Sequence, residues 1–134
     1  MQPRPRILTG LYAAALIFVT VLGWIPALAD ANGRLFGIFR LTWYNDALHL
    51  ASAAWALAAA LRSRAASLIF LIVFGILYLT DGLMGLAIGS GYLDLGVVFY
   101  GPRDLSFDFK LMANLPHIVM GAVALAAGLV WRRA

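Results

Sequence analysis

Cysteine and glutamate are absent from the 134 residues of this chain, and charge of either sign is scarce. The lack of cysteine excludes disulfide bonds, thiolate metal sites and cysteine nucleophiles. The lack of glutamate leaves six aspartates as the only acidic side chains. Charged residues make up 12% of the chain, whereas a soluble domain carries about 25%. Much of the surface must therefore face lipid, and the sequence predicts an integral membrane protein.

Motifs that carry catalysis are also missing. The chain has no phosphate-binding glycine loop, nucleophile elbow or His-Glu-x-x-His zinc motif, so we expect no enzyme activity. A net charge of +4 suggests a nucleic-acid binder at first sight, but the arginines lie at the ends of apolar stretches, where they set membrane topology. We therefore expect the lipid bilayer, and no nucleic acid, as a partner.

Four apolar stretches predict four membrane-spanning helices in one transmembrane domain over residues 1–134. About 20 helical residues cross the roughly 30 Å of hydrocarbon, and backbone groups in lipid must be bonded within their own segment. The predicted helices cover about residues 7–29, 44–61, 65–89 and 111–131. Between them we expect a turn at Asn32-Gly33, a tight hairpin at Arg62-Ser63-Arg64, and an interfacial segment at Leu105–Phe109, where apolar and polar residues alternate.

The distribution of charge predicts the orientation. One set of helix ends carries arginine and no acid, at Arg4, Arg6, Arg62, Arg64, Arg132 and Arg133. The other ends carry five of the six aspartates together with Arg34, Arg40, Arg103 and Lys110. The positive-inside rule places the first set in the cytoplasm, so we expect both termini there, in a bacterial inner membrane. Ala27-Leu28-Ala29 resembles a signal-peptide cleavage site, but the long apolar run before it favours an uncleaved helix.

The two halves of the chain share a pattern of Asp/Asn, two residues, His, three residues and a small residue. It occurs as Asp46-x-x-His49-x-x-x-Ala53 and as Asn114-x-x-His117-x-x-x-Gly121. A constant 68 residues separates the copies, from position 46 to 114 and from 49 to 117. The repeat predicts an all-α four-helix bundle built from two helical hairpins in the same orientation, related by an axis along the membrane normal. Small residues at the helix contacts would allow close approach of the backbones.

This pattern resembles a family of small bacterial four-helix membrane proteins whose function is unknown. Members have two hairpins, each with an Asn-x-x-His motif and a small residue at the start of its second helix. Asn114, His117 and Gly121 match that motif, whereas Asp46 and Ala53 replace the asparagine and the glycine in the first half. The resemblance implies a fold and no activity.

The two histidines allow a structural and a functional interpretation. In the structural one, Asp46 and Asn114 are N-caps, Pro116 is an early helical residue, and each histidine lies in a first turn, where it satisfies free polar groups. In the functional one, His49 and His117 are candidate ligands of a haem or a chlorophyll-type pigment. A metal site that also uses Asp81 is a third option, which nothing else in the sequence supports.

Asp81 lies well inside the third predicted helix, where an ionisable side chain is costly and faces the bundle interior or a partner. Counting residues inward from the helix ends places it near the depth of His117. We expect a hydrogen bond from Asp81 to His117 or to His49. We class Asp46, Asp81 and Asn114 as structural polar residues, and a proton-handling role of the Asp81 pair stays open.

These features favour a small accessory or structural membrane subunit, without catalysis, that packs against other membrane subunits. The alternatives are a haem- or chlorophyll-binding membrane protein that uses His49 and His117, and a small transporter or channel unit.

Overall fold

The computed structural model describes residues 3–40 and 42–134, and most of this chain is helical. The helices are α1 (Arg4–Gly23), the short 3-10 helix η1 (Pro26–Leu28), α2 (Trp43–Arg62), α3 (Arg64–Ile88), α4 (Gly96–Tyr100) and α5 (Phe107–Arg132). Two short strands, β1 (Arg34–Leu35) and β2 (Phe39–Arg40), pair antiparallel in the loop between α1 and α2.

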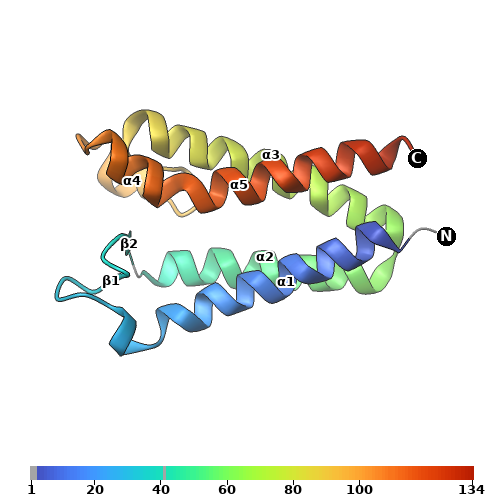
Figure 1. Ribbon diagram of the computed structural model, residues 1–134, viewed down its shortest axis with the longest axis horizontal. Coiled ribbons are helices and arrows are strands. Elements are labelled where there is room, and N and C mark those ends of the chain that lie inside the picture. The colour runs from blue at the N-terminus through green and yellow to red at the C-terminus, as the bar shows by residue number, and fades with distance from the viewer. Residues whose placement is uncertain (1–2, 41) are drawn as a thin grey trace.

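The four long helices run along the long axis of the molecule and alternate in direction (Figure 1). Helix α1 packs against α2, and α3 packs against α5, so the chain forms two helical hairpins. The start of α1, the α2–α3 connection and the end of α5 lie at one end of the molecule (Figure 1). The strands, α4 and the longer loops lie at the other end, which we call the loop end.

Three of these helices, α1, α3 and α5, are long and apolar enough to cross a membrane, so the chain is a small membrane protein. Helix α2 has 20 residues, as many as α1. It is not among the three because Asn45, Asp46 and His49 lie in its first two turns and lower its mean hydropathy. Its crossing of the membrane stays a prediction.

The first helix is shorter than the predicted 7–29, because α1 ends at Gly23. Pro26 explains the early end. A proline disfavours helical backbone at the residue before it, and Ile25 is indeed extended, with φ −93° and ψ 106°. The Asn32-Gly33 turn is confirmed: Gly33 has a φ of 74°, and its N–H donates to the carbonyl of Asp30.

The prediction that Asp46 and Asn114 cap their helices is wrong. The N-caps are Thr42 in α2 and Ser106 in α5, whose hydroxyls accept from backbone N–H groups three residues later. Both helices therefore begin earlier than predicted, and within Leu105–Phe109 the residues from Phe107 onward form the start of α5. The interfacial position of this segment stays a prediction.

The early starts move the histidine motifs deeper into their helices. His49 lies in the second turn of α2, and His117 lies about three turns into α5. Pro116 is a helix-interior proline and not an early helical residue. A proline inside a spanning helix is tolerated when neighbouring groups satisfy the freed carbonyl.

The tight hairpin at Arg62-Ser63-Arg64 is confirmed. Ser63 alone separates α2 from α3 and belongs to both ends. Its N–H donates to the carbonyl of Ala59, and its hydroxyl accepts from the N–H of Ala66. One residue thus ends the first hairpin and begins the second.

Glycines allow α3 and α5 to approach each other closely. A methyl group added at Gly75 or Gly121 would overlap the backbone of the facing helix, at Leu125 and Leu79 respectively. Along the same α3–α5 contact, a methyl group at Gly82 or Gly128 would overlap Ile118 or Ile72, and one at Gly85 would overlap the Asn114 side chain. In the sequence motif Gly85-x-x-x-Gly89, only the first glycine makes this helix contact, because Gly89 ends α3 with a φ of 86°.

An aromatic column fills the core between the two hairpins. Phe70, Phe74 and Tyr78 stack along α3, with centroid distances of 4.8 and 3.9 Å between successive rings. Tyr12 from α1 packs edge-on against Phe74 at 5.3 Å. The column ends at His117, whose ring lies 4.8 Å from that of Tyr78, and so the core leads directly to the polar site.

Candidate functional site: a polar cavity at the loop end

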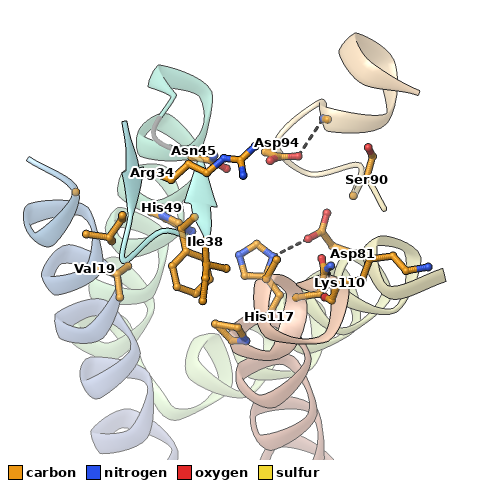
Figure 2. A pocket seen from close by; sticks show the side chains of 18 of the residues that line it. Val19, Arg34, Ile38, Asn45, His49, Asp81, Ser90, Asp94, Lys110 and His117 are labelled. Atoms are coloured by element: carbon orange, nitrogen blue, oxygen red, sulfur yellow. Dashed lines mark hydrogen bonds and ion pairs between the residues drawn. The ribbon is translucent and has the colours of Figure 1, made fainter. Parts of the chain in front are cut away.

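A cavity of about 300 Å³ lies at the loop end, between the two hairpins. Its polar lining residues are Arg34, Asn45, Asp46, His49, Asp81, Ser90, Asp94, Arg103, Lys110, Asn114 and His117. Apolar side chains from α1, the α1–α2 loop and α5 make up most of the remaining wall. Figure 2 shows Arg34, Asn45 and His49 on one side, Ser90 and Asp81 on the other, and His117 between them.

The centre of the site is a hydrogen-bonded pair formed by Asp81 of α3 and His117 of α5. The distance from His117 Nδ1 to Asp81 Oδ2 is 2.6 Å (Figure 2). The Asp81 side chain is 5% exposed, whereas that of His117 is 21% exposed, and both line the cavity. Of the two partners considered from the sequence, Asp81 therefore bonds to His117 and not to His49.

The other oxygen of Asp81 fixes the loop that follows α3. The backbone N–H groups of Tyr92 and Leu93 both donate to Asp81 Oδ1, each at 2.9 Å. Gly91 makes this wrapping possible, because a methyl group at that position would overlap the carboxylate. Asp81 therefore joins α3, the following loop and α5.

These hydrogen bonds also determine which ring nitrogen of His117 is left for a further partner. The Asp81 carboxylate accepts two backbone N–H groups, and an ionised carboxylate can only accept hydrogen bonds. With Asp81 as an ionised acceptor, the Nδ1–H group of His117 donates the hydrogen bond to Asp81 Oδ2. The remaining nitrogen, Nε2, then accepts a hydrogen bond when the ring is neutral and donates one when it is charged.

The two histidines lie side by side, although only His117 is bonded to the Asp81 carboxylate. Their ring centroids are 5.8 Å apart and the planes are nearly perpendicular, at 88°. On the core side of this pair, the Tyr78 hydroxyl bonds to Ser52 Oγ at 2.8 Å. The site is thus continuous with a buried polar link between α2 and α3.

The comparisons with known proteins identify a family. A family model described as Domain of unknown function (DUF4383) matches residues 6–99, which is more than half of the chain. The chain belongs to this family. Among curated proteins and among solved structures, none matches the chain. The match of the DUF4383 model includes His49 and Asp81 and ends before the Asn114-x-x-His117 motif.

The remaining two residues singled out from the sequence of this DUF4383 protein make local structural contacts. Asp46 Oδ2 accepts from the indole Nε1 of Trp24 at 3.0 Å, which ties the end of α1 to the start of α2. The amide of Asn114 donates to the carbonyl of Lys110 at 2.8 Å and lies against Gly85. Both residues also line the cavity.

The two copies of the sequence repeat differ in their surroundings. Ala53 and Gly121 are both buried at helix contacts, as the repeat predicts. The position that corresponds to Asp81 in the first half, 68 residues earlier, is however Ala13. His49 therefore lacks the carboxylate that orients His117, and the site of this DUF4383 protein is asymmetric.

The arrangement bears on which ligand the site could hold. Within residues 3–40 and 42–134, no group of three His, Cys, Asp or Glu side chains is placed to hold a metal ion. The volume of about 300 Å³ lies at the small end of the range for small-molecule pockets. The cavity suits a head group smaller than the macrocycle of a haem or a chlorophyll.

Several lining residues escaped the sequence analysis. Arg34 lies in the α1–α2 loop and places its guanidinium 5.6 Å from the ring centre of Phe109 on α5. Asp94 accepts from the N–H of Gly96 in the loop after α3. Both were interpreted only as outer-loop charges, and no spacing in the sequence indicated that these two loops meet over one cavity.

Proposed function

We propose that this DUF4383 protein is a non-catalytic membrane protein that binds a small molecule in the loop-end cavity. The observation that carries the proposal is the Asp81-oriented His117, which opens into a cavity and is partly exposed although it lies inside α5. A purely structural polar pair would be expected to be enclosed by side chains. A pocket with a few convergent polar groups is the usual form of a ligand site.

The test is to identify what accompanies the protein from its native membrane. The protein is isolated in mild detergent, extracted with organic solvent, and the extract is analysed by mass spectrometry beside that of a cavity-filling variant, Ala113→Trp. We expect a compound that is stoichiometric with the wild-type chain and depleted in the variant. Equal recovery of every compound from both proteins would refute a site in the cavity.

We further propose that α2 also crosses the membrane, which makes the protein a four-helix bundle with both termini in the cytoplasm of a bacterial cell. The arginines at the α2–α3 turn and at the chain ends support this orientation. Because the chain has no cysteine, single cysteines report topology directly. A membrane-impermeant maleimide should label Asn32→Cys and Asp104→Cys in intact cells, and Ala134→Cys only after permeabilisation. Labelling of Ala134→Cys in intact cells would contradict the orientation.

A second candidate, the accessory subunit predicted from the sequence, is favoured by the outer face of α5. Large apolar side chains follow one another there at helical spacing and are exposed: Met112, Leu115, Val119, Val123 and Val130. Such a stripe can contact lipid or a helix of another subunit. Chains that co-purify stoichiometrically, and are released by Val123→Arg, would support this role, whereas isolation of the protein alone would count against it.

The haem or chlorophyll alternative has a separate readout. A visible absorption band in protein isolated from its native membrane, lost in both His49→Ala and His117→Ala, would favour it over the smaller ligand proposed here. We expect no such band, because of the small cavity.

A further inference from the structure

The form of the cavity and the chemistry of His117 narrow the class of ligand. Resting on the proposed binding function, we infer that the ligand is a neutral, lipid-soluble molecule with a small carbonyl or hydroxyl head, which enters sideways from the bilayer between α1 and α5. Quinones or quinols with an isoprenoid tail have this chemistry, and so do diacylglycerols.

The entry route follows from how the helices surround the cavity. Tyr12 of α1 donates a hydrogen bond to the carbonyl of Met120 on α5, which joins these helices at the inner limit of the cavity. From there to the loop end, Val19 and Leu22 of α1 and Pro116 of α5 line the space. Pro116 is both a lining residue and exposed, so it lies where the cavity meets the outer surface of α5. In a spanning helix that surface faces lipid.

The walls are apolar where α1 and the adjoining side of α5 form them. From α1 the lining residues are Leu16, Val19, Leu22 and Gly23, and from α5 they include Phe109, Ala113, Pro116 and Met120. A charged or strongly hydrated molecule would lose its water on passing between such side chains, with no polar group there to compensate. An apolar tail would instead remain between these side chains, while the head reaches the histidine.

The polar lining does not select for a charged head. Three cationic residues are matched by three aspartates around the cavity, namely Arg34, Arg103 and Lys110 against Asp46, Asp81 and Asp94. Each aspartate already accepts a hydrogen bond, from Trp24, from His117 or from the N–H of Gly96. The Arg34 guanidinium lies over the Phe109 ring. Apart from the two histidines, the side chains of the site therefore leave no surplus charge of one sign, and a neutral head is the better match.

His117 supplies the hydrogen bond to that head. With Nδ1–H held by Asp81, its Nε2 accepts from a hydroxyl when the ring is neutral and donates to a carbonyl when it is charged. The presence or absence of a proton on Nε2 thus fits the same site to a carbonyl or to a hydroxyl oxygen. His49, whose ring lies 5.8 Å away, places a second imidazole beside the head.

The experiment uses the full chain in lipid nanodiscs, with ¹⁵N-labelled histidine. Only two histidines contribute signals, and His49→Asn assigns them. Four probes are titrated: a benzoquinone with a short isoprenoid tail, a diacylglycerol, oleate, and the same benzoquinone without its tail. We expect a saturable shift of the His117 Nε2 signal with one or both of the neutral tailed probes. A shift with only one of these two probes identifies whether a quinone or a diacylglycerol supplies the head.

Matched variants test the route and the contact. Val19→Trp narrows the space between α1 and α5 and should weaken binding at least about tenfold. Ile17→Trp, on the same helix and exposed but not lining the cavity, should leave affinity within about twofold. His117→Gln keeps a hydrogen-bonding group and should lose less affinity than His117→Leu, for which we expect about tenfold from one lost hydrogen bond. The variants' binding is followed by quenching of tryptophan fluorescence with the tailed quinone, or by competition against it. Circular dichroism confirms that each variant is folded.

The outcomes separate this inference from the proposed function. Preference for oleate, or binding of the tail-less quinone as strong as that of the tailed one, overturns the neutral lipid-soluble class while leaving a ligand site in place. Equal effects of Val19→Trp and Ile17→Trp overturn the route. If no probe shifts either histidine and no compound co-purifies, both the inference and the proposed function fail.

Discussion

Removing the Asp81 carboxylate should destabilise the protein much more than converting it to an amide. The carboxylate accepts three hydrogen bonds, two from the N–H groups of Tyr92 and Leu93 and one from His117. Asp81→Ala leaves two backbone donors and one imidazole donor without this acceptor. Asp81→Asn keeps an oxygen for the two backbone groups, and His117 can move its proton to Nε2 so that Nδ1 accepts from the new amide.

The magnitudes follow from the cost of leaving buried donors unpaired, about 1–3 kcal/mol each. Two backbone donors put the loss for Asp81→Ala at about 2–6 kcal/mol, to which the unpaired His117 adds. Water that reaches the loop lowers the observed loss toward the lower end of that range. For Asp81→Asn, which exchanges a charged hydrogen bond for a neutral one, we expect a loss of about 1 kcal/mol.

The assay is reversible unfolding of the purified protein in mixed micelles with increasing SDS, followed by circular dichroism. His117→Ala and the double variant Asp81→Ala/His117→Ala complete a double-mutant cycle, in which a direct pair should show a coupling of about 0.5–3 kcal/mol. The reasoning is refuted if Asp81→Ala and Asp81→Asn are equally stable, or if the coupling is zero.

Two further predictions concern the helix contacts. Gly121→Ala places a methyl group against the Leu79 backbone, so it should cost about 1–3 kcal/mol of stability in the same assay. Gly10→Ala, with open space at its Cβ position, should be neutral or stabilising. Equal effects of the two variants would argue against the close α3–α5 contact. Tyr78→Phe removes a buried hydrogen bond to Ser52 and should cost about 1 kcal/mol of stability. Adding Ser52→Ala to this variant should then cost little more. Fully additive losses would show that the two hydroxyls are not paired.

The sequence predicted the features of the fold that depend on long-range composition. Runs of apolar residues predicted the long helices, since any segment in lipid must satisfy its own backbone. Ser63 between two arginines predicted the tight turn for a local reason, because one polar residue that caps both helices is sufficient there. A depth argument, which needs only the rise per residue of a helix and the positions of the helix ends, predicted a bond from Asp81 to His117 or His49. The choice of His117 came from the structure.

The helix starts were predicted wrongly because several residues could serve as caps. Asp46 and Asn114 are good capping residues by type, but Thr42 and Ser106 lie earlier and are used instead. Starting at these residues extends helical hydrogen bonding through the polar first turns. Pro116 was interpreted as an early helical residue on the basis of soluble helices, whereas spanning helices accept an interior proline.

The cavity lay beyond what the sequence could predict, because loops from different parts of the chain form it. Arg34 and Asp94 belong to connections that meet only when the two hairpins pack. The repeat also indicated a symmetry that the polar groups do not share. His49 and His117 occupy matching positions, but a single aspartate, in α3, orients only one of them, and Ala13 stands at the corresponding position of α1.

The central claim is that the loop-end cavity holds a small, lipid-soluble ligand beside His117. Its most direct test is the ¹⁵N spectrum of the two histidines in protein isolated from its native membrane, recorded before and after the bound lipids are exchanged for a synthetic phospholipid. The account predicts that the exchange changes the His117 Nε2 signal, and that returning the extracted compound restores it. Identical spectra throughout, with Asp81 and His117 still paired, would show that the pair is structural and contradict the claim.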